Sequence, residues 1–237
     1  MGFKLGKNKV KKKMDYIYNP KNADELASIL HKKYMKCLDI FGNANDDIIL
    51  DLNDINVSNI NDLSWMFGSE SKRVKVIDIS EWDTSNVIDV EGMFSDCEYL
   101  EEIIGLEDIN LSGVKSLSNM FNGCYSLKSV DISNFNTKNI LSMYGMFASC
   151  HKLTEIKGID NIIVDNVRDM NYMFTSCYSL KSIDVSKWNL NANCKCRSMF
   201  AHCVNLEEIK GVEIFDNIKD KENKKYIFME CNKLIIK

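Results

Sequence analysis

The stretch Gly145-Met-Phe-Ala-Ser-Cys-His-Lys-Leu-Thr-Glu-Ile156 decides the fold, because the chain repeats it. A Met-Phe pair is followed by a Cys three residues later in most copies, and then by a Leu. The pairs are Met66-Phe67, Met93-Phe94, Met120-Phe121, Met146-Phe147, Met173-Phe174, Met199-Phe200 and an altered last copy, Ile227-Phe228. Their first residues lie 27, 27, 26, 27, 26 and 28 residues apart. A fixed period of this length predicts a solenoid, which is a stack of similar coils.

Each coil contains two recognisable pieces. The first, as in Leu127-Lys-Ser-Val-Asp-Ile132, alternates apolar and polar residues like a strand. The second, Ile140-x-x-Met143-x-x-Met146-Phe147-x-x-Cys150, has the spacings of three and four that fit a short helix or 3₁₀ turn. One strand and one helical turn per coil is the leucine-rich-repeat plan. We therefore expect an α/β solenoid over residues 48–237, with coils of about 26–27 residues.

Two segments precede the repeats. Residues 1–19 are rich in Lys and Asn without periodicity, which predicts a basic flexible tail. Residues 20–47 contain an amphipathic pattern, and Asn22 and Glu25 have capping-box spacing. A one-sided helix directly before a repeat array is expected to cap the first coil.

Composition fits a soluble protein, with 45% apolar and 27% charged residues and a net charge of −4. The first 36 residues carry ten Lys against three acidic residues, so the rest of the chain is acidic. An acidic solenoid predicts that nucleic acid is not the partner. Neither a signal peptide nor an apolar run long enough to span a membrane is visible, which predicts a cytoplasmic protein.

Aligning the coils places equivalent residues in rows. Six of the nine cysteines share one row, where side chains of parallel coils point the same way and bridge poorly, so free, buried thiols are expected. An apolar row should lie in the core, and it consists of Ile55, Trp82, Ile109, Phe135, Ile162 and Trp188. A row of Asn and Gly predicts left-handed backbone, and it consists of Asn59, Asn86, Gly113, Asn139, Asn166 and Asn193.

Charges on the predicted strands alternate in sign from one coil to the next. Asp131 and Asp184 share a row with Lys157 and Lys210, and Lys128 shares another with Glu101. Opposite charges on adjacent strands attract, so we expect ion pairs between coils.

No residue cluster predicts catalysis or a metal site. Cys194 and Cys196, close to His202, suggest zinc, but both cysteines fall in core rows of the repeat and the spacing matches zinc sites poorly. The chain has three histidines and no nucleophile elbow, phosphate-binding loop or dinucleotide fingerprint. We expect a protein that is not an enzyme and that uses no cofactor or metal.

The pattern Met-Phe-x-x-Cys-x-x-Leu-x-x-Ile-Asp-Ile-Ser, followed by Asp83-Thr-Ser-Asn-Val87, resembles the BspA-like leucine-rich repeats of bacterial surface proteins and lipoproteins. The resemblance covers residues 48–237. It implies adhesion or protein binding without catalysis, and a location at the cell surface or outside the cell. This sequence shows neither a signal peptide nor a lipobox.

The function expected from sequence is a protein–protein interaction module that is a monomer with a protein partner. The candidate contact residues are those that follow the row cysteines, where the chain should face outward, together with one neighbour: Tyr99, Tyr125, His151, Tyr178 and Val204. The alternative for these rings is that they only stack on one another. A second alternative for the whole chain is a structural protein that self-assembles through its uncapped C-terminal coil.

Overall fold

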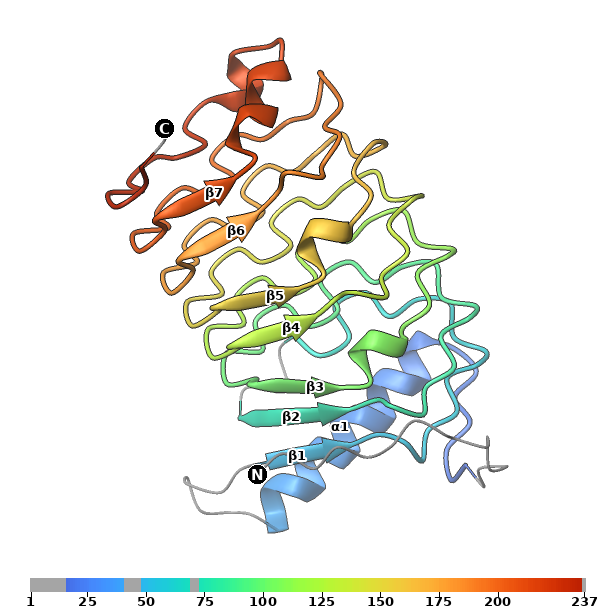
Figure 1. Cartoon of the computed structure of the whole chain (residues 1–237). Coiled ribbons are helices and arrows are strands. Elements are labelled where there is room, and N and C mark those ends of the chain that lie inside the picture. Colours follow the sequence, from blue (N-terminus) through green and yellow to red (C-terminus); the bar gives the residue numbers. More distant parts are fainter. Residues whose placement is uncertain (1–15, 41–47, 69–72, 236–237) are drawn as a thin grey trace.

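One parallel strand from each coil builds a solenoid (Figure 1). The computed structural model describes residues 16–40, 48–68 and 73–235. The strands are β1 (Ile48–Asp51), β2 (Val74–Asp78), β3 (Glu102–Ile104), β4 (Ser129–Asp131), β5 (Glu155–Lys157), β6 (Ser182–Asp184) and β7 (Glu208–Lys210). They form parallel sheets in the orders β1-β2-β3, β4-β5 and β6-β7. The predicted stack of coils is thereby confirmed, with a parallel β-solenoid as its architecture.

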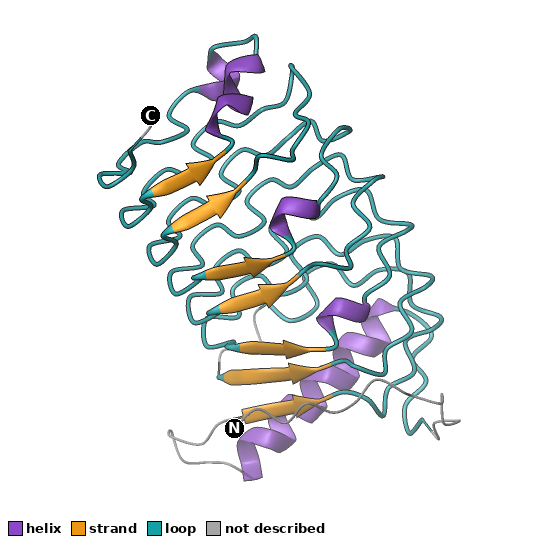
Figure 2. Ribbon diagram, in the orientation of Figure 1, coloured by secondary structure: helices purple, strands orange, loops and turns teal. Residues whose placement is uncertain are grey.

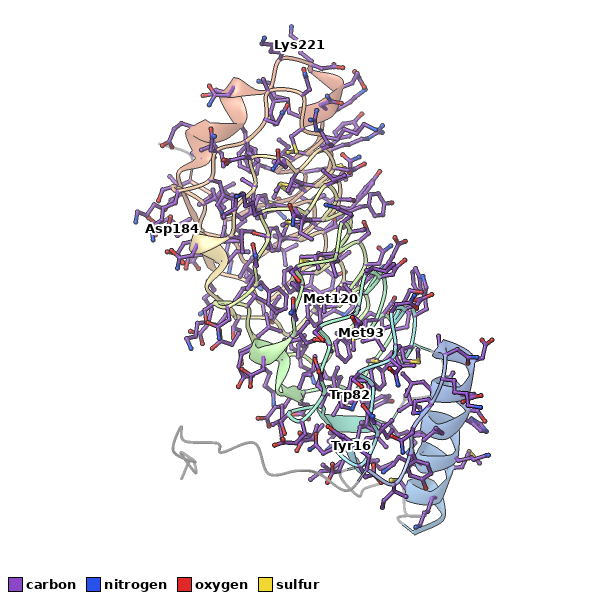
Figure 3. The ribbon with its side chains drawn as sticks, turned by 90° about the vertical axis from the view of Figure 1, so that its right-hand side faces the viewer. Tyr16, Trp82, Met93, Met120, Asp184 and Lys221 are labelled. Carbon is purple, nitrogen blue, oxygen red and sulfur yellow. The ribbon has the colours of Figure 1, made fainter. Side chains whose placement is uncertain are left out.

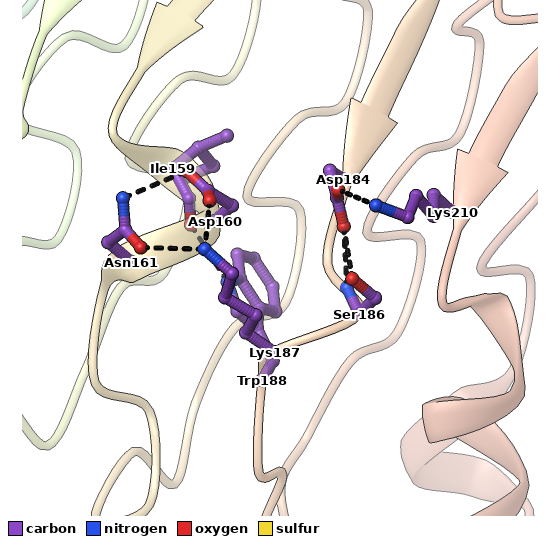
Figure 4. A network of polar contacts seen from close by, with 8 residues as sticks. All are labelled: Ile159, Asp160, Asn161, Asp184, Ser186, Lys187, Trp188 and Lys210. Atoms are coloured by element: carbon purple, nitrogen blue, oxygen red, sulfur yellow. Dashed lines mark hydrogen bonds and ion pairs between the residues drawn. The ribbon is translucent and has the colours of Figure 1, made fainter.

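The strand register places opposite charges on adjacent coils, as the sequence predicts. Asp131 lies opposite Lys157, and Asp184 lies opposite Lys210. Each pair forms an ion pair, with 2.7 Å between Lys210 Nζ and Asp184 Oδ2 (Figure 4). Lys128 and Glu101 pair in the same way, at 2.6 Å. The strand side therefore neutralises much of its charge internally.

Alternate coils differ at the end of the strand. In every second coil a glycine with φ between 84° and 87° begins a 3₁₀ helix; the glycines are Gly105, Gly158 and Gly211. These helices are η1 (Leu106–Asp108), η2 (Ile159–Asn161) and η3 (Val212–Asn217), and a further one is η4 (Glu222–Lys224) (Figure 2). A Cβ at these glycines would lie 2.3–2.4 Å from a serine Cα of the preceding coil. Only glycine allows this close approach.

The second piece of each coil is a series of turns rather than the expected short helix or 3₁₀ turn. Between Met143 and Cys150 the backbone forms turns, and Cys150 N–H donates to the carbonyl of Phe147, at 3.2 Å. Alternate amides leave the turn and donate to the next coil, as Phe147 N–H does to the carbonyl of Met173 at 2.9 Å. A spacing of three residues is common to helices and to successive turns, which is why the sequence pattern suggested a helix.

Left-handed residues fall in two rows of these turns, and not in the row of Asn and Gly for which the sequence predicted them. Gly145 and Ser149 have φ of 58° and 60°, and those of their counterparts that the structure describes also have positive φ. The predicted asparagines do not. Instead, Asn86 Nδ2 donates to the carbonyl of Ser58 at 2.7 Å, and Asn166 Nδ2 to that of Lys138 at 3.0 Å. The asparagines satisfy backbone carbonyls of the preceding coil.

The core is a set of continuous ladders along the solenoid axis. Phenylalanines of successive coils from Phe67 to Phe200 stack with ring centroids 5.1–5.7 Å apart. Met93 and Met120 of successive coils are also fully buried (Figure 3). The predicted apolar row from Ile55 to Trp188 is buried.

The row cysteines are free thiols, and each donates to a phenylalanine carbonyl of the preceding coil, as Cys150 Sγ does to Phe121 O at 3.1 Å. Burial raises the pKa of Cys177 to about 12. The thiols are therefore packed and hydrogen-bonded core side chains that stay protonated.

Helix α1 (Ala23–Ile40) lies against the β1 end of the stack (Figure 1). Glu25 N–H donates to Asn22 Oδ1 at 2.9 Å, which confirms the predicted N-cap. Leu26 and Leu30 join the core, and Lys33 forms an ion pair with Asp54 of the first coil at 2.7 Å. Residues 41–47 of the predicted 20–47 segment lie outside the described residues.

Of the predicted tail, residues 1–15 lie outside the described residues. Tyr18, which the sequence assigns to the tail, instead forms a parallel bridge with Ile55 of the first coil. Within the described ranges, α1 included, the chain holds no helix with the length and apolarity that a membrane span requires.

Candidate functional site

Three of the five predicted contact residues form one aromatic stack on the surface. The rings of Tyr125 and His151 lie 4.6 Å apart with an angle of 5° between their planes. His151 and Tyr178 follow at 4.5 Å and 13°. Tyr125 and Tyr178 remain 38% and 41% exposed. The predicted outward orientation of this slot is confirmed, and the rings also pack on one another, as the alternative interpretation expected.

The backbone fixes the position of these rings. In each coil a buried cysteine precedes the ring and a buried leucine follows two residues after it, as Cys124 and Leu127 do around Tyr125. Leu127 N–H donates to the carbonyl of Cys124 at 3.2 Å, which closes the turn that points Tyr125 outward. Lys152 N–H donates to the Tyr125 carbonyl at 3.2 Å, so adjacent coils hold the rings at one coil spacing. The stack is therefore built on a rigid support.

The stack presents a largely uncharged surface with hydrogen-bonding groups. Burial between the two tyrosine rings lowers the pKa of His151 and so favours the neutral imidazole. Two phenol groups and one neutral imidazole can both donate and accept hydrogen bonds. Flat aromatic rings with polar atoms are the side chains that most often anchor protein interfaces.

The two remaining predicted residues lie outside the stack. Tyr99 is 51% exposed, but it stands one residue later in its coil, where Glu98 occupies the slot of the rings. Within the described residues Tyr99 makes no ring contact with Tyr125. Val204 continues the row beyond Tyr178 with a half-buried aliphatic side chain. The candidate site is therefore Tyr125, His151 and Tyr178, referred to below as the aromatic stack.

The cysteines that suggested zinc do not converge with a histidine. Cys194 and Cys196 are buried in the core, whereas His202 Nδ1 lies 2.8 Å from Glu230 Oε2 at the surface. In the part of the chain that the structure describes, no three His, Cys, Asp or Glu side chains gather in an arrangement that could hold a metal ion.

A groove of about 510 Å³ lies between β3 and β4, where the sheet is interrupted. Glu102, Ile104 and Leu106 line one wall, and Lys128 and Asp131 line the other. No pattern of residues in the sequence predicts this groove. The nearest signal is the glycine of every second coil, because the 3₁₀ helix that follows Gly105 replaces further strand pairing with the next coil.

Comparisons with known proteins point to a repeat family without an assigned activity. A crystal structure of a leucine-rich repeat protein from Bacteroides ovatus ATCC 8483 is similar, with 20% sequence identity and a TM-score of 0.35. The similarity covers 69% of this chain and 45% of that one, so this chain spans less than half of its length. No curated protein matches the sequence. The profile of one family matches twice, over residues 35–154 and 115–235, and the chain therefore belongs to the family described as "Mycoplasma protein of unknown function, DUF285".

Proposed function

We propose that this chain is a non-enzymatic protein-binding module, and that the aromatic stack is its contact surface. The observation that carries the proposal is the set of three outward rings from three successive coils, held in parallel at 4.6 and 4.5 Å. Such a surface loses little conformational freedom when a partner covers it, because packing has already fixed the rings.

The solenoid supports this role, since repeat stacks offer extended surfaces to partners. We assign α1 to the same module as its N-terminal cap, because Leu26 and Leu30 join the core. The BspA-like resemblance favours an adhesive function, with the partner outside the cell. A membrane preparation or host extract is therefore a better source of partner than cytosol alone.

The test is a double variant, Tyr125→Ser with Tyr178→Ser, used as bait for partner capture beside the wild-type chain. Capture should be lost while the melting temperature falls by only a few degrees, because each aromatic pair contributes about 0.5–1.5 kcal/mol. The matched control is Tyr99→Ser, which removes an exposed ring outside the stack and should capture normally. Tyr125→Phe with Tyr178→Phe keeps the stacking and shows whether the hydroxyls take part.

Two outcomes would contradict the proposal. If a folded double variant still captures the partner, the stack is not the contact surface. If Tyr99→Ser, which leaves the stack intact, loses capture as completely as the double variant, the contact surface is not the stack.

A further inference from the structure

A second surface of the solenoid has a charge distribution that the strand side lacks. It is formed by the outward residues of the seven turn segments, which we name the turn face: residues 61–68, 88–95, 115–122, 141–148, 168–175, 195–201 and 223–229. Hydrogen bonds join neighbouring segments, as Gly92 N–H does to the carbonyl of Ser118 and Ser198 N–H to that of Lys225. These bonds make the segments one continuous face.

The two ends of the turn face carry opposite charge. The two N-terminal segments contain Asp62, Asp89 and Glu91 and have neither Lys nor Arg. The three C-terminal segments contain five basic residues and one acidic residue, namely Arg168, Lys195, Arg197, Lys224, Lys225 and Asp169. Strand-side charges pair between adjacent coils, whereas within the described residues the carboxylates of Asp62, Asp89 and Glu91 form no ion pair. At the basic end Lys225 pairs with Glu222 at 3.3 Å. The carboxylates of the acidic end are available to a partner.

Exposed apolar side chains lie on the same face between and beside these charges. Trp65 and Ile88 are exposed at the acidic end, Leu141 and Tyr144 in the middle segment, and Tyr226 at the basic end. Arg197 lies 5.7 Å and Lys225 5.3 Å from the centroid of the Tyr226 ring. The aromatic ring thus holds two cations at the surface of the basic end.

We propose that the turn face is the interface of an antiparallel dimer of this chain. The segment 141–148 has three turn segments on each side, so a two-fold axis through it brings the acidic end of each copy onto the basic end of the other. Asp89 and Glu91 then face the partner's segment 195–201, and Leu141 and Tyr144 lie beside their own counterparts at the axis. The two end segments on each side of the face are complementary in this arrangement, while a parallel arrangement would place their like charges together. Lys115 of the third segment lies opposite the partner's segment 168–175, which carries one basic and one acidic residue.

The size of the face sets the expected affinity. Seven segments at about 4.8 Å spacing give a length of about 30 Å, and four to five residues give a width of about 15 Å. Each copy would bury roughly 500 Å², or about 1,000 Å² in total, which is near the lower limit for a specific interface. We expect a weak dimer with a dissociation constant in the micromolar range. The sequence predicted a monomer, or self-assembly through the C-terminal edge, and this proposal differs from both.

Charge reversal tests the arrangement, with the dissociation constant measured by sedimentation at low salt. Two variants each reverse the charge of one of the two segments that face each other: Asp89→Lys with Glu91→Lys in 88–95, and Lys195→Glu with Arg197→Glu in 195–201. Each should weaken dimerisation at least about tenfold, because these two segments then meet with like charges twice across the two-fold axis. An equimolar mixture of the two should recover a heterodimer, and the quadruple variant, in which the charges of the two facing segments are exchanged, should recover the homodimer.

Control variants distinguish dimerisation through the turn face from dimerisation through another surface and from partner binding by the aromatic stack. Lys138→Glu with Lys181→Glu changes the net charge by the same amount at exposed positions off the turn face, and should dimerise like wild type. The aromatic-stack variant should also dimerise normally. Raising salt from about 50 to about 500 mM should weaken the wild-type dimer several-fold, since the Debye length falls from about 14 to 4 Å.

Three results would overturn the proposal. The first is a wild-type chain that stays monomeric at millimolar concentration and low salt. The second is a dimer whose dissociation constant is the same in both charge-reversal variants, since another surface would then hold it. The third is that neither the mixture nor the quadruple variant recovers binding. The basic end would then bind an anionic partner other than this chain, because reversing the charge of that end would abolish such binding in the same way.

Discussion

Replacing Gly158 by alanine should destabilise the solenoid, because a methyl group there would collide with the backbone of the preceding coil, as it would at Gly105 and Gly211. Gly158 has φ of 84°, and a Cβ there would lie 2.4 Å from Ser133 Cα and 2.7 Å from Ser133 N. Both atoms are backbone atoms of the adjacent coil, so no side-chain rotation can relieve the contact. Since carbon atoms pack at about 3.5–4.0 Å, the two coils must separate by more than about 1 Å.

The separation would weaken the hydrogen bonding between the coils of β4 and β5. Ile132 N–H donates to the carbonyl of Lys157 at 2.9 Å, one residue before the glycine. The left-handed conformation costs an alanine about 1–2 kcal/mol, and each backbone hydrogen bond that lengthens costs about 0.5–1.5 kcal/mol. We therefore expect a loss of about 3 kcal/mol, or a fall in melting temperature of about 6–12 °C for a chain of this length.

Gly145→Ala is the matched control, because it adds the same methyl group to a left-handed glycine with φ of 58°. Its Cβ would meet Asn119 Oδ1 at 2.6 Å, which is the end of a side chain that can rotate away. Trp65, Asn119 and Tyr172 occupy the same row with φ between 53° and 60°, so this row accepts side chains. Urea and thermal unfolding of both variants measure the difference. If the two variants agree within about 1 kcal/mol, the close approach of the coils at Gly158 is not what requires glycine.

Three further predictions concern thiols, backbone and pH. A thiol reagent added to native protein without reductant should find every cysteine reduced and should modify the partly buried Cys37 and Cys231 first, because the other seven are buried. Ser149→Gly should raise the free energy of unfolding by about 0.5–1 kcal/mol, since Ser149 has φ of 60° and glycine removes that cost while adding unfolded-state entropy. Burial raises the pKa of Asp131, but the hydrogen bonds from Lys157 and Ser133 outweigh it and lower the pKa to about 2. The pKa in the unfolded chain is about 3.9, so this stabilisation is complete above pH 4 and is lost as pH falls toward 2. Melting temperatures should fall over that range, and by a smaller amount in Lys157→Met.

Most of the fold could be predicted from the sequence because side-chain rows are a direct consequence of the period. Residues that repeat every 26–27 positions must stack in a solenoid, so the pairing of Asp131 with Lys157 follows from alignment alone. Backbone conformation within a row does not follow in the same way. Asparagine favours both left-handed backbone and side-chain hydrogen bonds, and at Asn86 and Asn166 the structure uses the second property.

The candidate site, too, could be predicted from the sequence only in part. The sequence places Tyr125, His151 and Tyr178 in one outward slot, and the structure confirms that position. The sequence also groups Tyr99 with these residues, although that ring stands one residue later in its coil. A shift of one residue in a turn changes the direction of a side chain. The separated charges of the turn face were visible in the same alignment.

The strand side differs from the aromatic stack and the turn face in how many of its groups already form bonds between coils. Within each sheet, backbone hydrogen bonds join neighbouring strands, as between β4 and β5. Between β5 and β6 the sheet is interrupted, and side chains cross the gap instead: Trp188 Nε1 donates to the carbonyl of Ile159 at 2.9 Å, and Lys187 pairs with Asp160 at 2.6 Å (Figure 4). A partner on the strand side would have to compete with these internal bonds, which removes much of the energy that new bonds would supply. The aromatic stack and the turn face offer exposed rings and charges that hold the coils together less, and for this physical reason we assign binding to them.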